Sequence, residues 1–148
     1  MKMRRIICFV LFATLLSCGS EDDCSGNLQD VLCLDDFGCP NAAFLVSIES
    51  QQEFQLIRNQ EDFDIMVFTS CDVQIDWEVY DLVIGAIGLS SGLMNIEKSI
   101  RTNCLLNQNL LDIVINTNIT ASADRITWQA VIPKLADDES LFVDITVE

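Results

Sequence analysis

One group of residues in this sequence could form a catalytic carboxylate pair. The acids are Asp76, Glu78 and Asp81, and the aromatic residues Trp77 and Tyr80 stand among them. Paired carboxylates hydrolyse glycosidic bonds, but the reaction needs a cleft that separates the two carboxyl groups, which a chain of this size seldom builds. We therefore predict no catalytic residues here. We expect the two aromatic side chains to fill the core, with their polar tips finding partners.

Composition narrows the possible chemistry further. The chain has 148 residues, with 23 acidic residues, 8 basic residues and no histidine. The absence of histidine removes the commonest general base, the commonest metal ligand and every nucleophile that depends on a histidine. The acidity argues against nucleic acid as a partner, because phosphates are bound by Lys and Arg. We predict a non-enzymatic protein with no cofactor.

Acidic clusters offer oxygen ligands for calcium. They are Asp22-Asp23, Asp35-Asp36 and Asp137-Asp138-Glu139. None has the spaced acids of a D-x-[DN]-x-[DN]-G loop, so we predict solvated turns and no metal site. Calcium or glycan binding stays an alternative function, and a calcium-dependent rise in melting temperature would favour the calcium version.

The N-terminus has the features of a cleaved export signal. A basic start is followed by the uncharged run Ile6–Leu16, which is too short to cross a bilayer as a helix. The sequence Leu15-Leu16-Ser17-Cys18 resembles the lipobox of bacterial lipoproteins. This resemblance implies that residues 1–17 are removed and that Cys18 is lipidated. The alternative is a plain signal peptide, with Cys18 an ordinary cysteine.

Lipidation would tether the protein to a membrane, because two or more acyl chains hold a protein firmly. Cys18 is followed by Gly19-Ser20-Glu21-Asp22-Asp23, which resembles the signal that exports lipoproteins of Bacteroidota to the cell surface. We expect an outer-membrane lipoprotein exposed at the cell surface, with a periplasm-facing protein as the alternative. Removal of the leader would leave 23 acidic and five basic residues, a net charge of −18.

The remaining cysteines indicate disulfides, because exported proteins meet an oxidising environment. They are Cys24, Cys33, Cys39, Cys71 and Cys104. The pairing of Cys71 with Cys104 would join two loop-like segments. Within the crowded first segment, Cys33 with Cys39 is the preferred pair. One cysteine would then stay free or join another chain.

The chain after the leader divides into two parts. Residues 18–41 lack apolar periodicity and are predicted to form a tether and a Cys-rich loop, whereas residues 42–148 are predicted to form a β-rich globular domain. The strands are expected where apolar and polar residues alternate or where both faces are apolar. They are Ala42–Glu49, Glu53–Arg58, Tyr80–Leu89, Leu93–Arg101, Leu110–Ile119, Arg125–Ile132 and Leu141–Val147.

The alternation also predicts which side chains face the core. Leu111, Ile113, Ile115 and Ile119 fall on one face of their strand, and Thr127 and Gln129 fall on the polar face of theirs. One short helix is predicted over residues 60–68, capped by Asn59, with Phe63, Met66 and Val67 on its apolar face. The predicted fold class is therefore mainly β (α+β), with an antiparallel sheet or sandwich and one short helix.

Several segments together resemble the C-terminal domain of the protease-complex subunit PrcB family and its small lipoprotein relatives. The resemblance covers Phe54 to the end of the chain. The residues that carry it are Leu56–Phe63, Ile75–Gly85, the turn Ser90-Ser91-Gly92 and the late segment Val131–Lys134. The resemblance implies a β-rich, non-enzymatic module that associates with or stabilises a secreted protease, and the module could also restrain that protease. The first functional hypothesis is accordingly an interaction module at the cell envelope. The second is a structural or ligand-binding surface lipoprotein.

Overall fold

A computed structural model describes residues 29–48, 53–103, 105–121 and 123–148. The predicted export signal, the predicted lipidation site Cys18, and Cys24 and Cys104 lie outside the described residues. In the described part of the chain, no helix is both long enough and apolar enough to cross a membrane.

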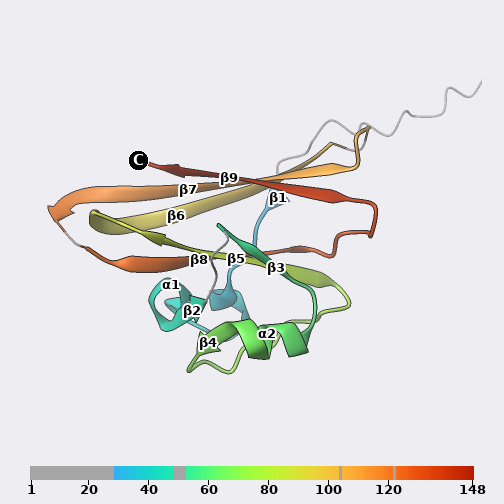
Figure 1. The fold of residues 1–148 in the computed structure, drawn as a ribbon, viewed down its shortest axis with the longest axis horizontal. Coiled ribbons are helices and arrows are strands. Elements are labelled where there is room, and N and C mark those ends of the chain that lie inside the picture. Colours follow the sequence, from blue (N-terminus) through green and yellow to red (C-terminus); the bar gives the residue numbers. More distant parts are fainter. Residues whose placement is uncertain (1–28, 49–52, 104, 122) are drawn as a thin grey trace, which may run out of the picture.

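Two β-sheets face each other and confirm the mainly β fold class (Figure 1). The first sheet has the strand order β1-β6-β7-β9, with β1 at Gln29–Asp30, β6 at Ser91–Asn103, β7 at Gln108–Ala121 and β9 at Ser140–Val147. The second has the order β3-β5-β8, with β3 at Gln55–Ile57, β5 at Tyr80–Gly88 and β8 at Arg125–Pro133. The predicted central position of the doubly apolar strand β5 is confirmed.

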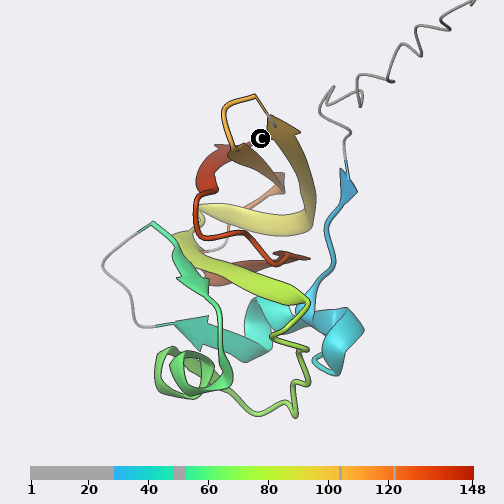
Figure 2. The ribbon, with the colours of Figure 1, turned by 90° about the vertical axis from the view of Figure 1, so that its right-hand side faces the viewer.

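Short elements cover the other face of the second sheet (Figure 2). They are η1 (Leu34–Phe37), α1 (Ala42–Leu45), β2 (Val46–Ile48), α2 (Gln60–Met66) and β4 (Val67–Thr69), and β2 pairs with β4. The second sheet is therefore the middle of three layers. Thr127 and Gln129 were predicted on the polar face of their strand, but they are buried. They are buried because α1 packs against β8 on that face.

The core between the two sheets follows the alternation of β7. Leu111, Ile113 and Ile115 are fully buried and pack in one cluster with Trp128 and Ile132 of β8. Ile119 was predicted on the same face, but it is fully exposed because β7 runs beyond the edge of the second sheet there. Burial of these apolar side chains is the main favourable term in folding.

A second core lies between the middle sheet and the short elements. Leu82 and Ile84 of β5 contribute to it, together with Leu34 and Cys39 from the segment predicted to be a loop. The described part of that segment is therefore built into the globular unit, which begins before the predicted boundary at residue 42.

Helix α2 begins as predicted. Asn59 Oδ1 accepts a hydrogen bond from the backbone N–H of Asp62 at 2.8 Å, and Phe63 is buried. The helix ends at Met66, before the predicted residue 68, because Val67 and Phe68 enter β4 and pair with β2.

One further prediction is wrong. Residues 42–45 form a helical turn and not the start of a strand, because the Asp35 carboxylate accepts from the backbone N–H groups of Asn41 and Ala42 and caps that turn. The strands pair mainly in the antiparallel direction, as predicted, with one exception. Strand β9 pairs in parallel with β7, in a register that places Ile113 beside Ile145.

Candidate functional site

The predicted carboxylate group separates in the structure. Asp76 and Glu78 are exposed in the turn before β5, where Asp76 Oδ1 accepts a hydrogen bond from the Glu78 N–H at 3.1 Å. The Asp76 carbonyl also accepts from the N–H groups of Val79 and Tyr80. These contacts close the turn that starts β5, which is a structural role.

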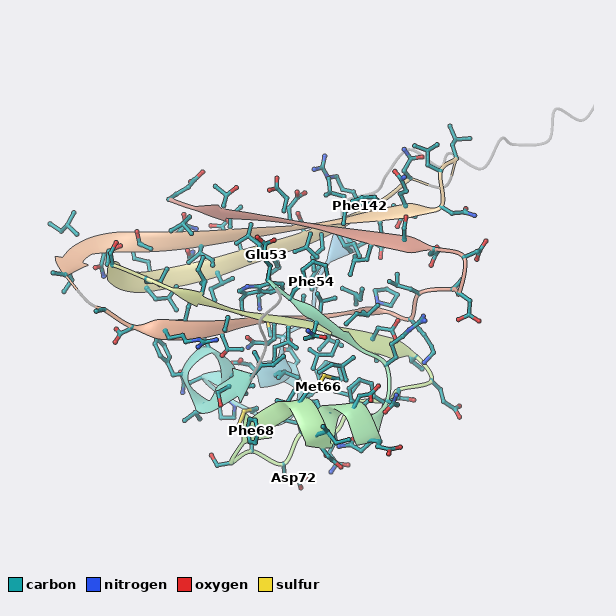
Figure 3. All side chains as sticks on the ribbon, viewed as in Figure 1. Glu53, Phe54, Met66, Phe68, Asp72 and Phe142 are labelled. Carbon is teal, nitrogen blue, oxygen red and sulfur yellow. A yellow bond between two sulfur atoms is a disulfide. The ribbon has the colours of Figure 1, made fainter. Side chains whose placement is uncertain are left out.

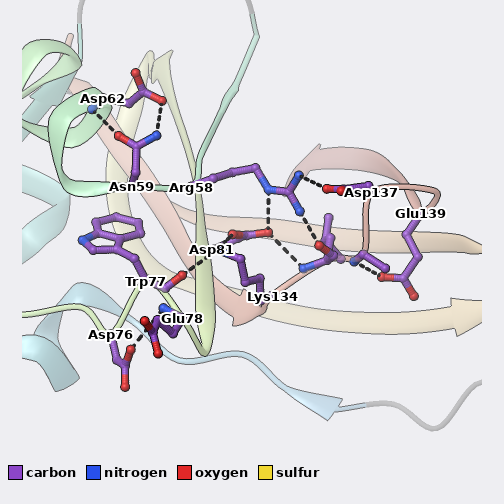
Figure 4. Close-up of polar contacts among 12 residues, drawn as sticks. Arg58, Asn59, Asp62, Asp76, Trp77, Glu78, Asp81, Lys134, Asp137 and Glu139 are labelled. Atoms are coloured by element: carbon purple, nitrogen blue, oxygen red, sulfur yellow. Dashed lines mark hydrogen bonds and ion pairs between the residues drawn. The ribbon is translucent and has the colours of Figure 1, made fainter.

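Asp81 is fully buried and lies in a cluster of charges (Figure 4). Its Oδ2 accepts from Arg58 Nε at 3.1 Å and from the Leu135 N–H at 3.0 Å, while its Oδ1 lies 3.8 Å from Lys134 Nζ. A buried carboxylate is tolerated only when it is paired and hydrogen-bonded, as it is here.

The two cations of this cluster make further contacts. Arg58 Nη2 donates to the Leu135 carbonyl and Nη1 lies 3.6 Å from Asp137, while Lys134 Nζ donates to the Trp77 carbonyl. The cluster therefore joins the end of β3, the start of β5 and the end of β8. Its one buried carboxylate, that of Asp81, is engaged with cations and a backbone donor, so we assign the cluster to holding the fold.

Both predicted core aromatic residues pack at the edge of the second core. The Trp77 ring lies 6.0 Å from that of Phe63 and its Nε1 donates to Gln60 Oε1 at 2.9 Å. The Tyr80 ring meets that of Phe37 edge-on at 5.7 Å. Both are half-buried and pack against the second core, whereas the sequence predicted that they would fill it.

Acidic residues in the described turns bond to nearby backbone groups. Asp36 accepts from the Cys33 N–H at 2.8 Å, and Glu139 accepts from the Ala136 N–H at 2.8 Å. Within residues 29–48, 53–103, 105–121 and 123–148, no three acidic or sulfur-bearing side chains gather as a metal site would require.

The structure corrects the predicted disulfide pairing. Cys39 is bonded to Cys71, with their Cα atoms 5.2 Å apart, and Cys33 is a free thiol. The preferred pairs of Cys33 with Cys39 and of Cys71 with Cys104 are therefore wrong. Cys39 follows η1 and faces the loop after β4, so the partner that is near in space lies far away in the sequence.

Strand β9 forms one edge of the first sheet. In the described part of the chain it pairs only with β7. The Glu148 N–H donates to the Ile115 carbonyl, the Glu148 carbonyl accepts from the Thr117 N–H, and the Ser140 N–H donates to the Asn107 carbonyl. Because hydrogen bonding alternates along a strand, the even-numbered residues of β9 bond to β7. The backbone groups of Leu141, Val143, Ile145 and Val147 therefore face the open edge.

Hollows adjoin this edge on both faces of the sheet. On the outer face, Phe142 lines a hollow with Leu110, Arg101 and Leu105, and its side chain is 53% exposed (Figure 3). On the inner face, Val143 and Ile145 line a second hollow with Ile87 and Trp128. We define the β9 edge surface as strand β9 with these two hollows.

The sequence reasoning missed this surface. The signal was Phe142, a large aromatic residue at the position of its strand where the alternation calls for a polar side chain. No protein-family model, no curated protein and no solved structure matches this chain.

Proposed function

We propose that this protein is a lipid-anchored interaction module of the cell envelope, and that it binds an extended segment of another protein along the β9 edge surface. The observation that carries the proposal is the open edge of β9, flanked by two hollows that are lined in part by apolar side chains. An edge strand offers a row of unpaired backbone donors and acceptors that a partner strand can complete.

The surface favours a particular kind of segment. Side chains of an added strand that point inward would meet the apolar Val143, Ile145 and Ile87. The acidic Glu53 also lines this hollow. Those that point outward would lie beside Asp144 and the exposed ring of Phe142. A segment in which apolar residues alternate with basic or aromatic residues fits both faces, and it complements a chain of net charge −15.

A second copy of the chain fits this edge less well. Two acidic chains repel each other, and pairing of two β9 strands can place Asp144 near its own copy, which costs free energy. The partner is therefore a different protein. The resemblance to the protease-complex subunit family makes a secreted protease the first partner to test.

Photo-crosslinking on intact cells tests the proposal. A photoreactive residue at position 142, on β9, should capture one protein, and the crosslinks should map to an extended segment of it. The matched control places the same residue at position 65 on α2, where Ile65 is 66% exposed but lies far from β9 in the fold. Capture of the same proteins at both positions, or of none at position 142, would contradict the proposal.

Two variants separate binding from folding. Val143→Pro removes one N–H that faces the open edge and leaves the bonds to β7 in place. Asp144→Lys keeps the strand and reverses a charge beside the edge. Both should abolish capture at position 142 while the circular dichroism spectrum stays that of the wild type. A folded variant of either kind that still captures the same partner would argue against recognition at this edge.

A further inference from the structure

The thiol of Cys33 and the amine of Lys98 are in contact beside the sandwich. Cys33 precedes η1 and Lys98 lies on β6, 65 residues away in the sequence. Lys98 Nζ lies 3.0 Å from Cys33 Sγ. Cys33 is a free, half-buried thiol, so a small molecule can reach the contact.

Lys98 differs in its partner from three other cations of the chain. Arg58, Arg101 and Lys134 each form an ion pair with an aspartate. Among the described residues no carboxylate pairs with Lys98, which lies on the core-facing side of β6 opposite the buried Ile113. The Lys98 amine therefore contacts the Cys33 sulfur and not a carboxylate oxygen.

The hollow that contains this contact also holds an unsatisfied acceptor. Gln129 lines the same hollow as Cys33 and Lys98, is 2% exposed, and its Oε1 has no hydrogen-bond partner among the described residues. A buried acceptor without a partner is costly and rare in native structures, and a redox role of the site is one of the explanations for it.

We propose that Cys33 and Lys98 are a modification site, and that dioxygen joins them covalently through one bridging oxygen atom. The thiol and the ammonium group react with one molecule of dioxygen. An S–O bond and an O–N bond form, while the S–H bond and two N–H bonds break. Sulfur and nitrogen each lose two electrons, and dioxygen gains all four. One oxygen atom stays in the bridge, the other leaves as water, and one proton is released to solvent.

The geometry favours an oxygen bridge over a direct bond. Two single bonds through one oxygen atom need only a small approach of sulfur and nitrogen from 3.0 Å, whereas a direct sulfur–nitrogen bond needs a much larger one. The thiol is already positioned, because the Cys33 N–H donates to Asp36 Oδ2 at 2.8 Å. After the reaction the nitrogen keeps one hydrogen, and Gln129 Oε1 is an acceptor on the wall of the same hollow.

The bridge would fasten the start of the globular unit to the first sheet. The segment around Cys33 is otherwise held to the first sheet only by the short pairing of β1 with β6 among the described residues, while the bridge of Leu32 to Val131 joins it to β8 of the second sheet. The Cys39–Cys71 disulfide ties the same segment to the loop after β4. The two covalent links would fix both ends of η1.

Peptide mapping of the full chain tests this assignment. The protein is purified from the membrane in air without reductant, free thiols are blocked, and the digest is compared with that of a sample kept under nitrogen with reductant. The expected product in air is a pair of peptides containing Cys33 and Lys98 whose mass is the sum of the two plus one oxygen atom and minus two hydrogen atoms. The air-exposed protein should also melt roughly 10 °C above the Cys33→Ser variant.

Matched variants make the result decisive. Lys98→Arg keeps the positive charge but removes the amine, and should leave Cys33 open to thiol-blocking reagents in air. Lys134→Arg changes a lysine that contacts no cysteine, and should leave the crosslink intact. Recovery of air-exposed Cys33 as a free thiol, as a sulfinic acid, in a disulfide, or bonded to Lys98 without oxygen would overturn the proposal.

Discussion

Gly85 and Trp128 face each other across the β5–β8 ladder with no room for another carbon atom between them. A Cβ built on Gly85 would lie 2.4 Å from Trp128 Cζ2 and 2.5 Å from the backbone oxygen of Glu53. The indole ring is fully buried and the second obstacle is backbone, so neither can move aside cheaply. The large ring of β8 is thus accommodated by the absence of a side chain on β5.

Substitution of this glycine should therefore destabilise the protein. Gly85→Ala overpacks the core between the sheets, and we expect the free energy of unfolding to fall by about 1–3 kcal/mol. Urea denaturation followed by tryptophan fluorescence measures the change. The control is Gly88→Ala on the same strand, where a Cβ meets nothing within 4 Å. An equal loss of stability in both variants would show that the Trp128 contact is not the cause.

The buried charge cluster predicts a difference between two aspartates. Asp81→Asn removes the charge that Arg58 and Lys134 pair with, and we expect a loss of about 2–4 kcal/mol, reduced somewhat because both cations reach solvent. Asp112→Asn breaks the surface pair with Arg101, which is shorter at 2.7 Å, yet should cost at most about 1 kcal/mol. Denaturant titration of both variants gives the comparison, and a larger loss at Asp112 would contradict burial as the deciding factor.

The Cys39–Cys71 disulfide should be a major source of stability. It links positions separated by 32 residues, and in the chain-entropy model its removal costs about 3–4 kcal/mol. The double variant Cys39→Ala, Cys71→Ala should therefore unfold at a clearly lower urea concentration than the oxidised wild type. A digest under non-reducing conditions gives an independent check, since it should contain the peptide pair joined through these two cysteines and lose it in the double variant.

The proposed lipid anchor predicts a specific dependence on Cys18. Cys18→Ala should abolish incorporation of labelled fatty acid and release the domain from the membrane fraction, because the acyl chains are the only attachment proposed. Cys33→Ser is the matched control and should retain both label and membrane association. Retained fatty-acid label in Cys18→Ala would refute lipidation at that residue.

The sequence could predict features that depend on neighbouring residues. The cap of α2 needs only Asn59 and Asp62, and the burial of Leu111, Ile113 and Ile115 follows from the period of a strand. The helical turn at residues 42–45 was missed because its cap comes from Asp35, seven residues before Ala42. The alternation of small and large residues from Ala42 onward is typical of a strand, and it gives no indication of the contact with Asp35.

The candidate sites were less predictable, because each joins residues that are distant in the sequence. Cys33 meets Lys98, and Cys39 meets Cys71, only after the segment before residue 42 has docked on the sandwich. The β9 edge arises because the chain crosses from one sheet to the other between β8 and β9, and neither strand's pattern specifies parallel pairing with β7. Phe142 is the residue that could have indicated this surface, because it is an apolar side chain on the polar face of its strand.

The parallel pairing of β9 with β7 also sets a limit on the timing of folding. Residues 108–115 of β7 can pair with β9 only after residues 140–147 have been synthesised. The chain must also return along the length of the sheet before this parallel pairing can form. Contacts that span so much sequence form slowly. A newly made chain would therefore lack this neighbour of β7 until its last strand has been synthesised, and during that period a chaperone could bind the uncovered side of β7.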